Sequence, residues 1–426
     1  MSDHLKRILF ISSHAPPAIG GPQNMYNLIK DLPVSSYSIL TSFYHIDNVS
    51  ARKGTWLPGE YIFYDSPRAT REQTKGGYEH SPVSQWRDRA AKLKIAIRQL
   101  PLARAVFGIP VVIGQINQIV REGQKATRDR SIEIMMGFSD YGPAMIGTYL
   151  LHRRTKVPYY LFLFDIYKGN NFFFPGGILA VLFEERIFRE AQKIVVTNEG
   201  TQEFYRARYG DSIADKMVVI YNSVFPEPYL QNQTPPYNPK PPYTILFTGR
   251  IYWPQVRSIK NLLRAVEGIN DLDIKVKIYA PHPPEYVRSL GIESPKMSLD
   301  MAPPTEMPRI QGAADILLLP LSWHTKSPGI INTATPGKLT DYLIAGRPML
   351  IHAPASTHLV AYAKKYGFAM IVDKEDLGAL RDGIRRLLLD ISLAEKLIKN
   401  AKETFFRNHD ANKNKKIFRN LFIAND

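Results

Sequence analysis

A short segment in the last third of the chain places a lysine and an aspartate at the start of a predicted helix. In TPGKLTDYLIAGRPMLIHAP, Pro336 and Gly337 break the chain before a helix that we expect over 338–345. Free amides at a helix N-terminus attract anions, and Lys338 adds a positive charge beside them. The Asp341 carboxylate can accept two hydrogen bonds from neighbouring sugar hydroxyls. The segment therefore predicts a site for a sugar that carries an anionic group.

The same segment has a second interpretation that needs no ligand. Asp341 then stabilises the helix dipole, Lys338 is a solvated side chain, and Gly346 ends the helix as a C-cap. Both interpretations stay open on this segment alone.

Two other positions suit contacts with phosphate. Arg250 follows the apolar run TILFTG, and its planar guanidinium can bind a phosphate through two hydrogen bonds. Gly20 and Gly21 follow the first apolar run, and glycine lets backbone amides approach a phosphate or sugar oxygen closely. A plain turn explains the two glycines equally well.

The apolar runs predict two parallel sheets that would position these residues. Strand-like runs alternate with helix-like runs along the chain, which is typical of βαβ units. The runs of the first half lie at 7–13, 37–43, 132–138, 158–165, 193–198 and 217–223. Those of the second half lie at 244–250, 273–281, 314–322, 348–354 and 368–373. We therefore expect an α/β fold of two Rossmann-like, doubly wound domains that face across a cleft, where such sheets bind ligands.

The domain boundary is expected at the proline-rich segment 225–243, which has no helix or strand periodicity and resembles a stiff linker. This assigns residues 1–224 to an N-terminal domain and 244–405 to a C-terminal domain. A last helix, within 406–426, is expected to pack back on the N-terminal domain.

Composition restricts the classes of function. The chain has 426 residues, a formal net charge of +16 and no cysteine, which excludes disulfides, thiolate metal sites and cysteine nucleophiles. The charge favours anionic partners, but no nucleic-acid-binding motif is present, so we expect no nucleic-acid partner. Asp-Leu-Asp at 271–273 lies between a helix and a strand, where aspartates commonly end elements, so we expect no essential metal. The N-terminus has no apolar leader, which favours a cytoplasmic location.

The basic segment 86–104 carries Trp86, Leu93, Ile97 and Leu100 at helical spacing. Such a helix suits contact with an anionic membrane surface, and it suits equally a helix packed on the core with a solvated basic face.

Several segments resemble one family in the same order along the chain. PGKLTDYLIAGRPML resembles the nucleotide-sugar-binding segment of family-4 glycosyltransferases, which are retaining enzymes of the GT-B fold. RILFISSHAPPAIGGPQNMYNLIKDL resembles the first strand, glycine loop and helix of the family. ILFTGRIYWPQVRSIKNLLRAV resembles the opening of its C-terminal domain. The resemblance covers nearly the whole chain except 45–130.

The resemblance implies donor-binding roles in the C-terminal domain. Asp341 stands where the family has the second of two glutamates, which binds the ribose, and Thr333 stands where it has the first. Arg250 matches the arginine that binds the donor diphosphate. Lys260, ahead of Arg257, is the expected partner of that arginine, although both lie beyond the usual spacing.

The resemblance also implies an acceptor site in the N-terminal domain. Many members carry a histidine after the strand that matches 158–165, whereas here Phe164 takes its place and Asp165 follows. Asp165 is therefore the candidate for binding or deprotonating an acceptor hydroxyl, or it caps the next segment.

The implied activity is the retaining, metal-independent and cofactor-independent transfer of a sugar from a nucleotide-sugar donor to a hydroxyl of a glycan or lipid-linked glycan. Three alternatives stay open: a nucleotide-sugar epimerase of the same fold, an inverting transferase, and a non-catalytic basic binding module.

Overall fold

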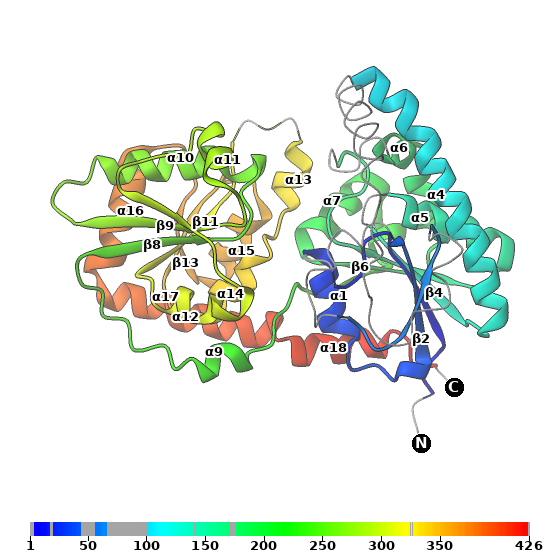
Figure 1. Cartoon of the computed structure of the whole chain (residues 1–426). Coiled ribbons are helices and arrows are strands. Elements are labelled where there is room, and N and C mark those ends of the chain that lie inside the picture. Colours follow the sequence, from blue (N-terminus) through cyan, green and yellow to red (C-terminus); the bar gives the residue numbers. More distant parts are fainter. Residues whose placement is uncertain are drawn as a thin grey trace, which may run out of the picture. The chain divides into compact units, whose positions relative to one another are not determined.

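Two parallel β-sheets organise the chain (Figure 1). The computed structural model describes residues 4–17, 20–43, 56–65, 101–139, 142–170, 176–323, 325 and 327–424. Unit 1 comprises Met1–Ile220 and Lys415–Asp426, and unit 2 comprises Tyr221–Asn414. Within the described ranges, no helix is both long and apolar enough to cross a membrane.

In the described part of unit 1, seven parallel strands form one sheet in the order β3-β2-β1-β4-β5-β6-β7. Their bounds are Ile8–Ile11 (β1), Tyr37–Thr41 (β2), Glu60–Phe63 (β3), Ile134–Phe138 (β4), Tyr159–Leu163 (β5), Lys193–Val196 (β6) and Met217–Val219 (β7). The chain order reverses between β1 and β4, so the carboxyl ends of these strands mark the topological switch point of the sheet.

Helices cover both faces of this sheet (Figure 1). One face packs against α1 and the end of α18, and α5 covers the other face at β4. The helices of unit 1 are Gly21–Ile29 (α1), Pro101–Asp129 (α4), Pro143–Thr155 (α5), Gly176–Glu190 (α6), Glu199–Tyr209 (α7) and Asp211–Ala214 (α8), with a 3-10 turn at Val34–Ser36 (η1). Of the basic segment 86–104, residues 86–100 lie outside the described residues.

In the described part of unit 2, six parallel strands form a sheet in the order β10-β9-β8-β11-β12-β13. Their bounds are Tyr243–Thr248 (β8), Ile274–Tyr279 (β9), Met297–Asp300 (β10), Ile316–Pro320 (β11), Met349–His352 (β12) and Ala369–Val372 (β13). The chain order reverses between β8 and β11, as it does between β1 and β4 of unit 1.

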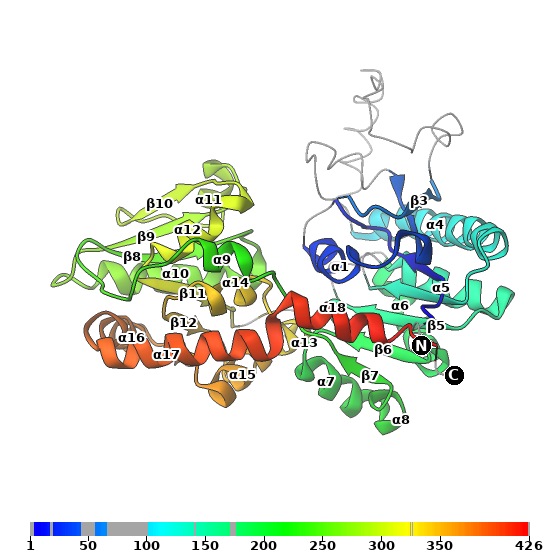
Figure 2. The same cartoon turned by 90° about the horizontal axis from the view of Figure 1, so that it is seen from below.

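Alternate side chains of these strands enter two separate cores. Ile245 and Phe247 pack with α10 and α16 on one face, whereas Leu246 packs with α14 and α15 on the other. Helix α17 contacts α14, α15 and α16 (Figure 2). The helices of unit 2 are Glu227–Gln231 (α9), Trp253–Glu267 (α10), Pro284–Ser289 (α11), Met307–Gly312 (α12), Pro328–Thr333 (α13), Lys338–Ile344 (α14), His358–Tyr366 (α15), Leu377–Leu389 (α16) and Ile391–Thr404 (α17), with a 3-10 turn at Pro304–Glu306 (η4) and a π-helical turn at Phe405–His409 (η5).

The fold expected from the sequence is confirmed in its two Rossmann-like sheets, and each predicted apolar run contains a strand. Strands β3 and β10, which lie at sheet edges, were not predicted from the sequence. Their side chains are largely half-exposed, so these strands need no continuous apolar run.

The proline-rich segment 225–243 belongs to unit 2 and is more than an extended linker. It contains α9, and it buries Tyr229 and Tyr237. The Tyr237 hydroxyl donates a hydrogen bond to the Leu387 carbonyl at 2.9 Å. Prolines kept the periodicity of this segment low, but its tyrosines attach it to the core of unit 2.

The last helix, α18 (Ala411–Asn420), begins in unit 2, and its residues from Lys415 onward belong to unit 1. Phe418 and Phe422 are fully buried in the core beneath α1. The ring of Phe418 stacks on that of Phe10 at 6.2 Å between centroids.

We expect Phe418→Ala to destabilise unit 1 by about 3–5 kcal/mol, since it removes a buried ring from a close-packed core. Ile417→Ala is the matched control, because Ile417 is the neighbouring residue and is 38% exposed. Hydrogen exchange of the β1 amides, followed by mass spectrometry, measures both changes. Equal exchange in the two variants would show that the C-terminal residues contribute nothing to this core.

Candidate functional site

The carboxyl end of β8 lies at the switch point of the unit 2 sheet, where ligands bind in open α/β folds. Arg250 follows this strand, and its side chain is exposed. The next residue, Ile251, donates its backbone N–H to His282 Nε2 at 3.0 Å. Burial and the nearby Arg250 charge both lower the pKa of His282, so this ring is neutral and Arg250 is the cation of the loop.

Lys338 reaches the same end of β8 from α14. Its Nζ lies 4.2 Å from the ring centroid of Phe247, the penultimate residue of the strand. A Cβ atom on Gly249 would lie 3.4 Å from Lys338 Cε, and Gly249 has a φ of +104°. Any other residue at position 249 would have a strained backbone, and its side chain would crowd the lysine. Glycine is therefore favoured here for both reasons.

Gln255 connects Lys338 to the Arg250 loop. Its side chain is 1% exposed and lies in the first turn of α10. With its amide nitrogen facing the Arg250 carbonyl at 2.9 Å, its oxygen accepts a hydrogen bond from Lys338 Nζ at 3.2 Å. The buried amide thus fixes the lysine and the loop relative to each other.

Asp341 lies one turn after Lys338 in α14. Its Oδ1 accepts a hydrogen bond of 2.7 Å from the hydroxyl of Tyr229, which also lies 3.2 Å from Gln311 Oε1. Gln311 in turn donates to Thr248 Oγ1 at 3.3 Å. These hydrogen bonds join α14 to α9 and α12 to the end of β8, and the Tyr229 hydroxyl lies between the two pairs.

Burial sets the charge states of both α14 residues. It lowers the pKa of Lys338 to about 7, against the opposing effect of the Asp341 charge. It raises the pKa of Asp341 to about 6, although the Tyr229 hydrogen bond and Lys338 act in the other direction. Between these two values both groups are largely charged, so the pair can attract an anion at Lys338 and accept hydrogen bonds at Asp341.

Gly337 and Thr333, the two other predicted residues of this region, differ in how open they are to a ligand. Gly337 has an ordinary helical φ of −55°. Apart from its neighbours in the chain, no described residue has an atom within 4 Å of the place where its Cβ would be, so its surroundings are open. Thr333 ends α13 and is 6% exposed, and its hydroxyl donates to the Gly329 carbonyl at 2.8 Å. The Thr333 hydroxyl is therefore engaged by its own helix.

Lys260 lies elsewhere in unit 2. It follows the start of α10 by two helical turns, about 10 Å along the axis. Its Nζ lies 2.8 Å from the position of a Cβ on Gly291, in the loop between α11 and β10. Arg257 forms an ion pair with Glu375. Lys338, rather than either of these, shares the end of β8 with Arg250.

In unit 1, Gly20 and Gly21 begin α1 at the switch point. Gly20 has a φ of +87°, which favours glycine, and a Cβ on Gly21 would lie 2.9 Å from ring carbons of Phe164. Asp165 follows this phenylalanine and is exposed. The structure therefore brings Gly21 close to the residue that precedes Asp165.

The aspartates of the Asp-Leu-Asp sequence lie away from these sites. Asp271 Oδ1 accepts a hydrogen bond of 2.6 Å from Arg385 of α16. Within the described ranges, no group of three or more His, Asp or Glu side chains has the arrangement of a metal site.

Sequence reasoning missed Tyr229 and Gln255. Tyr229 lies in a segment without periodicity, so nothing in its surroundings marked it. Gln255 is the fifth residue after Arg250. It could have been found as a polar residue in the first turn of an amphipathic helix that follows the predicted phosphate-binding arginine.

Solved structures with the same architecture extend over nearly the whole chain. A glycosyltransferase from Rickettsia africae is 13% identical with a TM-score of 0.62, and the alignment covers 97% of each chain. Anabaena HepE, solved in complex with UDP and glucose, is 12% identical with a TM-score of 0.63, covering 98% of this chain and 99% of that one. Sucrose-phosphate synthase from Thermosynechococcus elongatus is 13% identical with a TM-score of 0.66, with the same coverage.

The chain has the GT-B fold. No protein-family model and no curated protein matches its sequence. The likeness at this low identity concerns the fold, so activity has to be argued from the residues at the end of β8.

We expect Tyr229→Phe to raise the pKa of Asp341 above its value of about 6, because the lost hydrogen bond stabilises the ionised carboxylate. The pH dependence of the Asp341 carboxyl ¹³C shift measures the change. Tyr237→Phe, which removes another buried hydroxyl of the same segment, is the control and should leave this titration unchanged. An unaltered midpoint in Tyr229→Phe would contradict the assigned hydrogen bond.

Proposed function

We propose that the protein is a glycosyltransferase that moves a sugar from a nucleotide-sugar donor to a hydroxyl of a glycan or lipid-linked glycan. The configuration of the sugar is retained, and neither metal nor cofactor is needed. The observation that carries the proposal is the convergence of Arg250, Lys338 and Asp341 at the switch point of unit 2. Likeness of fold to HepE, whose solved complexes contain UDP and UDP-glucose, supports a nucleotide-sugar as the ligand.

In this proposal, the two cations bind the donor diphosphate. Arg250 is exposed after β8 and supplies a planar guanidinium, whereas Lys338 is fixed by Gln255 and supplies a point charge. Negative charge grows on the diphosphate as the sugar leaves, and cations fixed in advance stabilise that charge without reorganising. This electrostatic effect lowers the barrier to breaking the bond between the sugar and the diphosphate.

Asp341 binds the ribose in the same proposal. Its Oδ1 already accepts the Tyr229 hydrogen bond, so in this proposal Oδ2 accepts hydrogen bonds from the ribose hydroxyls. Gly337 leaves space for the donor beside α14. Thr333 has its hydroxyl engaged by the Gly329 carbonyl, so it contributes to the shape of the donor site.

Unit 1 contributes the acceptor site. Asp165 has a pKa raised to about 6 by loss of solvation, so its carboxylate can receive the proton of the acceptor hydroxyl. Gly20 and Gly21 belong to the donor site in this proposal, and their backbone amides offer hydrogen bonds to a phosphate or sugar oxygen. The acceptor oxygen forms a bond to the anomeric carbon, the bond between that carbon and the diphosphate breaks, and the acceptor proton passes to Asp165 as the nucleoside diphosphate leaves.

Thermal melting against a panel of nucleoside diphosphates and their sugars tests the proposal. A ligand at 100 times its dissociation constant stabilises the fold by about 2.7 kcal/mol, which gives a clear shift in melting temperature. The stabilising donor is then incubated with candidate acceptors, with and without EDTA, and the anomeric configuration of the product is read by NMR. Epimerisation of the donor alone, an inverted product, or salt-sensitive nucleic-acid binding without any donor shift would each favour an alternative.

We expect Lys338→Met to weaken binding of the nucleoside diphosphate by about tenfold or more, since a charge-assisted hydrogen bond is worth about 1.5–3 kcal/mol. Lys260→Met removes the same charge from α10 and should leave affinity unchanged. Calorimetric titration compares the two variants. A loss in Lys260→Met with normal binding in Lys338→Met would return the diphosphate contact to Lys260.

Asp341→Asn should weaken donor affinity by a similar factor, about tenfold, because an amide replaces a charged acceptor. The asparagine carbonyl can still accept from Tyr229, and it avoids the burial of a charge that raises the pKa of Asp341. The melting temperature without ligand should therefore not fall. Unchanged donor affinity, measured by calorimetry beside the melting curves, would remove Asp341 from the donor site.

A further inference from the structure

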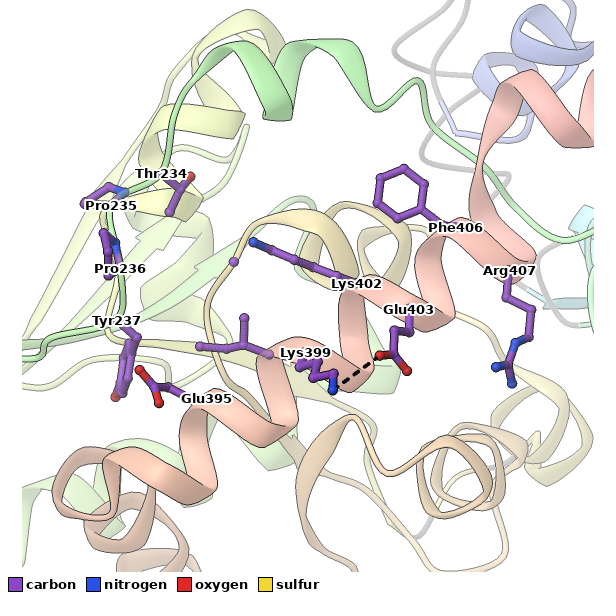
Figure 3. A pocket seen from close by; sticks show the side chains of 12 residues that line it. Thr234, Pro235, Pro236, Tyr237, Glu395, Lys399, Lys402, Glu403, Phe406 and Arg407 are labelled. Atoms are coloured by element: carbon purple, nitrogen blue, oxygen red, sulfur yellow. Dashed lines mark ion pairs between the residues drawn. The ribbon is translucent and has the colours of Figure 1, made fainter.

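A cavity lies in unit 2 between α17 and the proline-rich segment (Figure 3). Its volume is about 870 Å³, which is within the range of small-molecule sites. Gly346, two residues beyond the end of α14, contributes to its lining. None of the residues assigned to the donor site lines this cavity.

The side chains of Lys402 and Thr234 meet at Gly346. A Cβ on this glycine would lie 3.7 Å from Lys402 Nζ and 3.4 Å from Thr234 Cγ2. The Thr234 oxygen is on the side of Gly312: it accepts a hydrogen bond from Asn232 at 3.2 Å and lies 2.5 Å from the place of a Cβ on Gly312. Figure 3 shows Lys402 extending from α17 toward Thr234. The Lys402 ammonium and the Thr234 methyl group therefore lie together in one small area of the cavity.

Apolar surface lies next to this lysine. Phe406 lines the cavity and is 45% exposed, a large fraction for an aromatic ring. Pro235, Pro236 and Tyr237 line the opposite side (Figure 3). A ligand here would cover both an exposed ring and the proline surface.

The charges of the cavity favour an anion. Glu403 lies 4.0 Å from Lys399 and is balanced by it. Arg407 lies over the ring of Tyr366. Lys402, in contrast, forms no ion pair with any residue in the part of the chain that the structure describes, and Glu395 is the remaining carboxylate of the lining.

We propose that this cavity binds a small, soluble organic phosphate whose phosphate contacts Lys402 and whose apolar body packs on Phe406 and the prolines. Lysine suits phosphate as a compact point charge. The site is separate from the donor site and does not rest on the proposed function.

Phenyl phosphate is a suitable probe, with inorganic phosphate and phenol as its two halves. Calorimetric titration into the full chain should give an affinity for phenyl phosphate about tenfold or more above that for either half. Lys402→Met should weaken this binding about tenfold or more. Lys396→Met is the matched control, because it removes an exposed lysine of the same helix outside the cavity, and it should bind as the unaltered chain does.

Two further variants locate the binding. Phe406→Ala should weaken phenyl phosphate and leave inorganic phosphate unchanged. Lys338→Met should keep full affinity for phenyl phosphate, whereas Lys402→Met should keep full affinity for nucleoside diphosphates. A failure of donor binding is thereby distinguished from a failure of this site.

Three results would overturn the proposal: equal binding in Lys402→Met and the unaltered chain, equal losses in Lys402→Met and Lys396→Met, or loss of binding in Lys338→Met. A Lys402-dependent interaction with vesicles of phosphatidylcholine and phosphatidic acid, without phenyl phosphate binding, would replace the soluble ligand by a lipid surface. Melting curves of each variant check that the exposed substitutions leave the fold intact.

Discussion

Two buried hydrogen bonds, from Tyr229 to Asp341 and from Gln311 to Thr248, are the constraint on which the candidate site depends. Buried polar groups have to be paired, because an unpaired one costs about 1–3 kcal/mol. The first bond joins α9 to α14, the second joins α12 to β8, and the Tyr229 hydroxyl lies 3.2 Å from Gln311 Oε1, so the two pairs are held next to each other. Tyr342 strengthens this arrangement, since its hydroxyl accepts the Thr248 N–H at 2.9 Å.

Once α14 is fixed in this way, the position of Lys338 follows. The side chain has to cross the end of β8, and the absence of a side chain at Gly249 gives it a path over Phe247. Gln255 then holds its ammonium beside the Arg250 loop. The lysine therefore comes from a helix about 90 residues further along the chain than the arginine, although both lie at one strand end.

Site residues that follow a strand or begin a helix could be predicted from the sequence. Site residues that are placed by packing between distant segments could not. Arg250 and Asp341 could be predicted because an apolar run and a glycine-bounded helix mark where each lies. Lys260 was expected beside Arg250 from the family resemblance, but two turns of α10 carry it about 10 Å along the helix axis, and its Nζ lies close to Gly291. Tyr229 was hidden in a segment read as a linker, since a single buried tyrosine leaves no periodicity.

The shifted pKa values of Lys338 and Asp341 have a consequence for how a diphosphate would bind. Burial brings the two pKa values close together, at about 7 and about 6, so each group loses part of its charge near neutral pH. A diphosphate beside Lys338 favours the protonated ammonium and raises its pKa, so binding takes up a proton. The same anion disfavours the Asp341 carboxylate, unless ribose hydroxyls donate hydrogen bonds to it. A ligand that carries both diphosphate and ribose therefore satisfies the pair together, whereas inorganic diphosphate satisfies Lys338 and adds repulsion at Asp341. This charge pairing favours the complete nucleotide over its phosphate portion.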